Sequence, residues 1–161
     1  MEEFYGVEYI HVNYDMIWSP EIILHNNADG VYMPDSFKDF KMLLYSNGTI
    51  VYQPMGIFTS HCNINVRDFP YDEQICSMFF TTMVYSSDVV RFEAVHGAPL
   101  VSQMKTNPEW NLVNSKITEV KRREHEMSPI NQTLIKCSLH LVRKPLFYTI
   151  YILLPTIAIT S

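Results

Sequence analysis

The chain has 161 residues, enough for one domain with an ordinary core, and 13% of them are aromatic, which is typical of a strand-rich protein. Its net charge of -5 argues against nucleic-acid binding, because no basic stripe is available to neutralise phosphates. The one basic run, Lys121-Arg122-Arg123, is followed by Glu124 and Glu126, and we interpret it as a solvated face of a strand or loop.

Short strands separated by turns are predicted along the chain. The expected strands are Ile22 to Leu24, Lys41 to Tyr45, Thr49 to Tyr52, Cys62 to Val66, Cys76 to Tyr85, Val89 to Ala94 and Ile135 to Leu141. The expected turns are Asn27-Ala28-Asp29-Gly30, Ser46-Asn47-Gly48 and Asp68-Phe69-Pro70-Tyr71. Alternation is clearest in the last strand, which we expect to be antiparallel and half-buried, with Cys137 on its apolar face as a small buried hydrophobe. The pattern predicts an all-β sandwich.

Two cysteines enclose a short loop: Cys62 and Cys76 are separated by the thirteen residues NINVRDFPYDEQI. They lie between two apolar-rich segments, so a disulfide between them would link two neighbouring strands. Such a disulfide is expected only outside the reducing cytosol. In the chain-entropy model such a disulfide stabilises the fold by roughly 3 kcal/mol. A zinc site is the alternative, although structural zinc needs four ligands in paired short spacings and only His61 lies nearby. The interval is too short for the inter-sheet disulfide of an immunoglobulin-type adhesion domain.

Catalysis has little support in the residue pattern. The six histidines are scattered, and no HExxH pattern, GxSxG elbow or glycine-rich phosphate loop occurs. We therefore expect neither an enzyme nor a bound cofactor or metal.

The cysteine loop contains Phe69-Pro70-Tyr71-Asp72, and with its C-x13-C spacing it resembles the signature loop of the Cys-loop receptors, the pentameric ligand-gated ion channels. Phe-Pro-aromatic-Asp resembles the nicotinic acetylcholine receptor branch. The stretch from Trp18 to Gly30 is similar to that branch's first ligand-face loop, and the stretch from Arg143 to Tyr148 is similar to the junction with the first membrane helix. The resemblance covers essentially the whole chain. It implies an immunoglobulin-like extracellular sandwich over residues 1–144 and the start of a membrane helix over 145–161.

Both ends of the chain are expected to be truncated relative to that family. No signal peptide opens the sequence, and the family would place an N-terminal helix and further strands ahead of it. The apolar stretch from Leu146 to Ile159 is interrupted by Pro155 and is shorter than the about 20 residues that cross a bilayer; a buried core segment is the alternative. Sequons at Asn47 and Asn131 are glycosylation candidates and indicate an extracellular location.

The resemblance also implies a transmitter site between two subunits, where aromatic side chains hold a quaternary ammonium by cation–π attraction. The positions of the principal face are His25, Met83, Glu124 and Gln132. None of them rebuilds an aromatic box, and the adjacent cysteines of α-type subunits fall on Glu126 and Met127, so we expect a non-α subunit without a competent principal face. The positions of the complementary face are Leu43, Val51 and Gln53; the alternative for them is an ordinary subunit contact.

The family would also have the cysteine loop touch the pore domain. Phe69 and Pro70 would then form an apolar knob, and Asp72 would carry a charge near Arg143, a kind of contact suited to transmitting a displacement. For Asp72 the alternative is that it satisfies the amides of its own turn.

The predicted function is therefore that of a subunit of an acetylcholine receptor-like ion channel. Its expected partners are other subunits in a homo- or hetero-pentamer, a transmitter, most simply acetylcholine, and membrane lipid. The expected location is the plasma membrane, at the postsynaptic side. The alternative is a secreted soluble Cys-loop ligand-binding protein, or a truncated regulatory isoform, that does not gate a pore.

Overall fold

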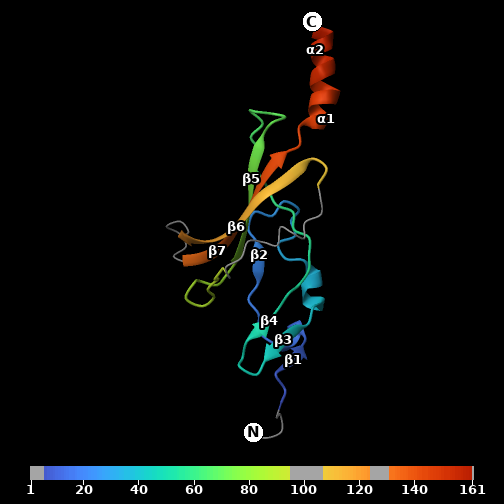
Figure 1. Ribbon diagram of the computed structural model, residues 1–161. Helices are drawn as coiled ribbons and strands as arrows, with labels where there is room; N and C mark the ends of the chain where they lie inside the picture. Colours follow the sequence, from blue (N-terminus) through green and yellow to red (C-terminus); the bar gives the residue numbers. More distant parts are fainter. Residues whose placement is uncertain (1–5, 95–106, 124–130, 161) are drawn as a thin grey trace.

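A computed structural model describes residues 6–94, 107–123 and 131–160. The chain forms two antiparallel sheets followed by a short C-terminal helix (Figure 1). The first sheet lies toward the N-terminal end, and the helix extends from the opposite end of the second sheet. This arrangement confirms the predicted all-β class, and a short helix follows the last strand.

The first sheet contains β1 (Tyr9–Val12), β3 (Met42–Tyr45) and β4 (Ile50–Val51), in the order β1-β3-β4. A tight turn joins β3 to β4, as the Asn-Gly pair predicts. The amide of Gly48 donates to the carbonyl oxygen of Tyr45 at 2.9 Å, and Gly48 has a φ of +85°, a conformation that favours glycine. Short 3-10 helices at Tyr14–Met16 and Asp35–Asp39 connect the strands.

The second sheet contains β2 (Ile22–Leu24), β5 (Glu73–Thr82), β6 (Trp110–Arg123) and β7 (Asn131–Arg143), in the order β2-β5-β7-β6. The central strand β7 pairs antiparallel with both β5 and β6. Its polar side chains pair with those of β5 across the ladder: Ser138 lies 3.1 Å from Ser77, and His140 lies 3.0 Å from Glu73. The predicted antiparallel strand is therefore confirmed. The side chains on its polar face bond to side chains of β5 and are not simply solvated.

The core is small and partly aromatic. Its buried apolar side chains are Val12, Ile23, Leu24, Met42 and Leu134. Phe58 stands edge-on to Phe37 and to Phe80, with centroids 5.7 and 5.4 Å apart, which links the connecting segment to β5. Gly56 allows this approach, because a Cβ there would lie 2.5 Å from a ring carbon of Phe37.

Several predicted strands differ from those observed. Residues Cys62 to Val66 form no strand, and the backbone of Asn65 bonds to the side chain of Gln74 and not to a strand. Residues 89–94 form no strand, since the amides of Val89 and Val90 turn back to the carbonyl of Ser86. The strands β1 and β6 were not predicted. Cys137 is half-buried, less enclosed than expected, and burial raises the pKa of its thiol.

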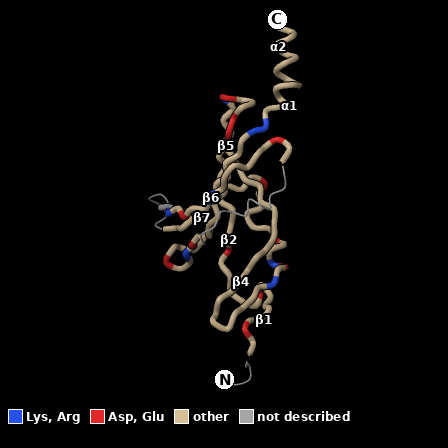
Figure 2. The backbone as a smooth tube through the Cα atoms, viewed as in Figure 1, with Lys and Arg blue, Asp and Glu red and all other residues tan. Residues whose placement is uncertain are grey.

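The C-terminal helix begins directly after the second sheet. It runs through α1 (Leu146–Tyr148), a π-helical turn (Thr149–Leu153) and α2 (Leu154–Thr160). Figure 2 shows that this helix carries neither acidic nor basic residues. Most of its large apolar side chains are exposed. Among the described residues, no helix combines the length and the apolar character needed to cross a bilayer.

Candidate functional site

A disulfide closes the cysteine loop: Cys62 and Cys76 are bonded, with Cα atoms 5.2 Å apart. Cys76 belongs to β5, whereas Cys62 lies in a segment that forms no strand, so the disulfide links a connecting segment to a strand and does not link two strands. Inside the loop, the buried side-chain amide of Gln74 accepts from the Asn65 backbone amide at 2.9 Å and donates to the Asn65 carbonyl at 2.8 Å. The cysteine loop is thus closed both by the disulfide and by the hydrogen bonds between Gln74 and Asn65.

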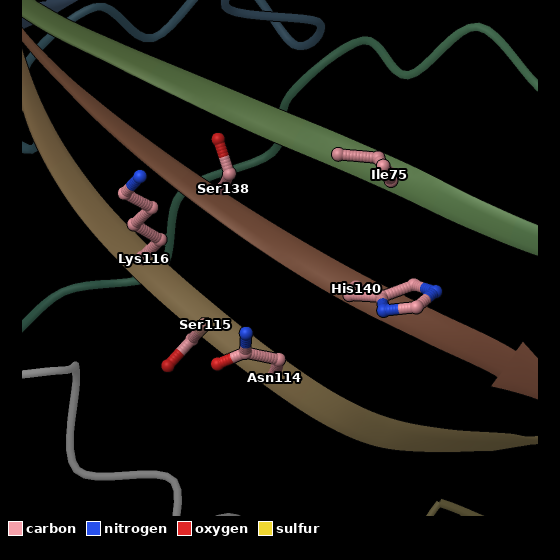
Figure 3. A pocket seen from close by; sticks show the side chains of 6 residues that line it. All are labelled: Ile75, Asn114, Ser115, Lys116, Ser138 and His140. Atoms are coloured by element: carbon pink, nitrogen blue, oxygen red, sulfur yellow. The ribbon is translucent and has the colours of Figure 1, made fainter.

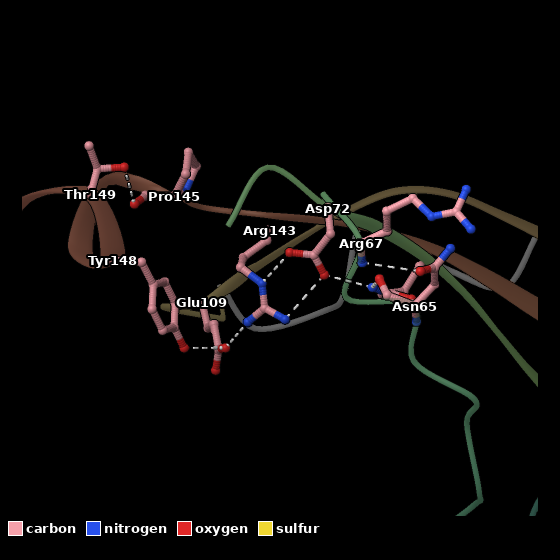
Figure 4. A network of polar contacts seen from close by, with 9 residues as sticks. Asn65, Arg67, Asp72, Glu109, Arg143, Pro145, Tyr148 and Thr149 are labelled. Carbon is pink, nitrogen blue, oxygen red and sulfur yellow. Dashed lines mark hydrogen bonds and ion pairs between the residues drawn. The ribbon is translucent and has the colours of Figure 1, made fainter. Parts of the chain in front are cut away.

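Asp72 and Arg143 meet at the end of this sheet. Asp72 directly precedes β5 and Arg143 ends β7, and the backbone amide of Arg143 donates to the carbonyl of Asp72 at 3.1 Å. The guanidinium then binds the carboxylate in a bidentate manner, with Nε donating to Oδ1 at 2.7 Å and Nη2 donating to Oδ2 at 3.2 Å (Figure 4). Both side chains are buried.

The charges in this pair stabilise each other. The hydrogen bonds from Arg143 lower the pKa of Asp72, and the Asp72 carboxylate raises the pKa of Arg143. The second carboxylate oxygen of Asp72 also accepts from Gln74 at 2.6 Å. The Asp72 carboxylate therefore bonds to the side chains of Arg143 and Gln74, and not only to the amides of its own turn.

Aromatic rings surround the guanidinium of Arg143. Its Cζ lies 4.1 Å from the centroid of Trp110, 5.2 Å from that of Phe69 and 5.3 Å from that of Tyr148. All three distances lie within the range of cation–π attraction. The first strand residue of β6, the cysteine loop and the C-terminal helix thus converge on one side chain.

Glu109 is a further partner of Arg143. Its carboxylate accepts from Arg143 Nη1 and, at 2.7 Å, from the hydroxyl of Tyr148, and this hydrogen bond raises the pKa of Tyr148. The side chain of Asn107 accepts from the backbone amides of Glu109 and Trp110, which fixes the start of β6. We call Asp72, Glu109, Arg143 and Tyr148 the junction cluster.

The tip of the cysteine loop also contacts the helix directly. Phe69 stands edge-on to Tyr148 with centroids 5.0 Å apart, and the Tyr71 hydroxyl lies 3.2 Å from Thr149 Oγ1. Pro70 is fully buried, while Phe69 remains 41% exposed. Phe69 therefore contacts the first helical turn, whereas the side chain of the neighbouring Pro70 is enclosed by the protein.

The described positions of the expected principal face lie at the opposite end of the second sheet. His25 follows β2 and is exposed, and Met83 follows β5 and is 65% exposed. Gln132 is buried in β7, where its amide donates to the carbonyls of Thr82 and Met83 at 3.1 and 3.3 Å. The Gln132 side chain therefore links β7 to the end of β5 by hydrogen bonds. Glu124, Glu126 and Met127 lie outside the described residues.

The expected complementary positions belong to the first sheet. Leu43 pairs with Val51 across the β3–β4 ladder, both are half-buried, and Gln53 beyond β4 is exposed. The two sets of positions thus lie on different sheets of the chain.

A shallow hollow crosses the polar face of the second sheet (Figure 3). It measures about 190 Å³ and is lined by Ile75, Asn114, Ser115, Lys116, Ser138 and His140. Ser115 is buried, its hydroxyl has no hydrogen-bond partner among the described residues, and it points away from Ser138 and His140 in Figure 3. The hollow contains none of the predicted site residues. Within the described part of the chain, no three His, Cys, Asp or Glu residues are grouped to hold a metal ion.

The two-sheet fold, the disulfide loop and its joint with a following helix define the extracellular domain of a Cys-loop receptor. Residues 1–145 match the family described as the neurotransmitter-gated ion-channel ligand binding domain, and the chain belongs to this family. It is a family of channel subunits and not of enzymes.

Similar proteins are acetylcholine receptor subunits. The chain is 32% identical to the acetylcholine receptor subunit beta-like 2 of Drosophila melanogaster over 99% of its length. It is 30% identical to the neuronal subunit beta-4 of Gallus gallus and 31% identical to the neuronal subunit beta-3 of Homo sapiens, again over 99% of its length. These matches cover 32%, 33% and 34% of the respective relatives, so the chain spans about a third of their length.

Proposed function

We propose that the chain is the ligand-binding domain of a non-α subunit of an acetylcholine receptor-like channel, and that the junction cluster couples this domain to the pore. The observation that carries the proposal is the position of Arg143. It ends β7, and its side chain bonds to Asp72 in the cysteine loop and to Glu109 before β6.

The contacts of the cluster give a route for a displacement. If β6 and β7 shift together, Arg143 and Glu109 move with them, because they are attached to the ends of these strands. Glu109 is bonded to Tyr148 in the first helical turn, and Phe69 leans on the same ring. A movement of the sheet end therefore reaches the helix by a polar contact and an aromatic contact, both only partly buried.

The ligand site is proposed to lie between subunits of a pentamer at the plasma membrane, with acetylcholine as the transmitter and a postsynaptic location. His25, Met83 and Gln132 do not rebuild the aromatic box of a principal face, so this subunit contributes the complementary face at Leu43, Val51 and Gln53. The apolar segment 145–161 is proposed to begin a membrane helix in contact with lipid.

The test uses a chimera in which this chain replaces the matching part of the Gallus gallus beta-4 subunit, expressed with a subunit that has a complete aromatic cage. Arg143→Gln should leave surface assembly measurable but remove the agonist-evoked current. Arg67→Gln is the matched control, because Arg67 is an exposed arginine of the cysteine loop, whereas Arg143 is buried against that loop. Unchanged gating in the Arg143 variant would refute the coupling role.

The ligand-face assignment has a separate test. Agonist binding is measured on receptors in which this chain alone supplies the principal face, and we expect no saturable high-affinity binding. Saturable binding that is abolished by changing Met83 would overturn the assignment.

A further inference from the structure

The two sequons of the chain, at Asn47 and Asn131, are equivalent as sequence patterns but occupy very different places in the fold. Asn47 is exposed in the turn between β3 and β4, at the tip of the hairpin. A Cβ built on the neighbouring Gly48 meets no atom within 4 Å, so open space surrounds the tip. A large group attached here would project into solvent.

The turn also presents the Asn47 side chain in a defined way. Its carbonyl oxygen accepts from the backbone amide of Thr49 at 2.9 Å, which commits the oxygen to the turn. The amide nitrogen of Asn47 has no hydrogen-bond partner among the described residues, and Thr49 is exposed. The nitrogen that would be modified and the hydroxyl that completes the sequon are therefore both accessible, and the modification would break no bond of the fold.

The second sequon begins inside the ladder of the second sheet. Asn131 pairs with Arg123, and its carbonyl accepts from the backbone amide of Ser87 at 2.7 Å. The two residues that complete the sequon are buried, since Gln132 is 8% and Thr133 is 9% exposed. Gln132 is in addition bonded to the end of β5. Asn131 itself is exposed, but Thr133, which completes this sequon, becomes inaccessible once β7 has paired.

We propose that Asn47 is the N-glycosylated residue of this chain and that Asn131 remains unmodified. The donor is an oligosaccharide linked to a lipid pyrophosphate. A bond forms between the Asn47 amide nitrogen and the anomeric carbon, the bond from that carbon to the pyrophosphate breaks, and the nitrogen loses one proton as the lipid pyrophosphate leaves. The glycan would prevent a neighbouring subunit from contacting the tip of the hairpin. A subunit that contacts Leu43 and Val51 would therefore contact the strands β3 and β4 and not the turn between them.

The site is measured on the chimera with the beta-4 subunit, expressed in animal cells. Trypsin separates the two sequons, because Asn47 lies in the peptide 42–67 and Asn131 in the peptide 124–136. A glycoamidase in heavy-oxygen water converts each glycosylated asparagine into an isotope-labelled aspartate, which mass spectrometry reads. A digest without the amidase corrects for spontaneous deamidation at Asn47-Gly48.

We expect the label on the first peptide and none on the second. Asn47→Asp keeps the carbonyl that accepts from Thr49 and removes the acceptor amide, so it should abolish the glycan while the subunit still reaches the surface. Thr49→Val should abolish it as well. Label on Asn131 at the level of Asn47, or none on Asn47, overturns the proposal. The outcome is independent of gating, because it requires only passage through the secretory pathway.

Discussion

The replacement Asp72→Asn tests the contact on which the junction cluster depends. It replaces the carboxylate that accepts two hydrogen bonds from Arg143 by a neutral amide of nearly the same size. Removing one partner of a buried ion pair costs about 3–5 kcal/mol. Because Glu109 still compensates Arg143, we expect the lower end, ~3 kcal/mol, which for a chain of this length lowers Tm by about 6–12 °C. Asp68→Asn, at an exposed aspartate of the same loop, should leave Tm unchanged.

The same replacement has a pH signature. Because the folded-state pKa of Asp72 is lowered by Arg143, its contribution to stability is present above the unfolded pKa of about 3.9 and is lost as pH falls through the folded pKa. The difference between the native chain and the variant should therefore be largest at neutral pH and shrink in acid. Thermal unfolding is followed by the fluorescence of Trp110, which lies against Arg143, in a Trp18→Phe background. Equal stability at pH 7, or a difference that persists in strong acid, would refute this reasoning.

Three more changes probe separate parts of the molecule. Tyr148→Phe keeps the ring but removes the hydrogen bond to Glu109, so in the chimera the half-maximal agonist concentration should rise while surface expression stays constant; an unchanged concentration would contradict a relay through this bond. Replacing both loop cysteines by serine should lower the unfolding free energy by about 3 kcal/mol, measured by denaturant titration, and a loss below 1 kcal/mol would contradict the chain-entropy account. Gly56→Ala places a methyl group against Phe37 and should cost about 1–3 kcal/mol in the same titration, whereas a neutral effect would mean that the ring moves freely.

Local patterns in the sequence were sufficient for some elements and not for others. The alternation from Ile135 to Leu141 predicted β7, and the Asn47-Gly48 pair predicted the hairpin between β3 and β4. The 14-residue strand β6 was not predicted, because a register shift between Leu112 and Asn114 interrupts the alternation that would have revealed it. A bulge shifts every later side chain to the other face, and the sequence pattern then loses its period.

The joint could be anticipated only in part. Family resemblance brought Asp72 near Arg143, and the structure has them in contact. Glu109 and Trp110 were missed, because they reach Arg143 through the register of β6 with β7, in which Trp110 faces Arg143. Such a register depends on pairing between distant segments. No turn was predicted at Asn107-Pro108, although this pair favours a turn and could have indicated where β6 begins. Likewise, no sequence pattern indicates that the Gln132 amide holds the carbonyls at the end of β5.

The amide of Gln74 behaves toward Asn65 as a neighbouring peptide group would in a sheet, since it both accepts and donates. The cysteine loop is therefore a ring within a ring, with the disulfide closing the outer one and this amide pair closing the inner one. Chemical reduction severs the outer ring alone. Phe69 and Asp72, which lie inside the inner ring, then keep their backbone frame, so the redox state of the cysteines and the contacts of Phe69 and Asp72 with Tyr148 and Arg143 are separable properties of one loop.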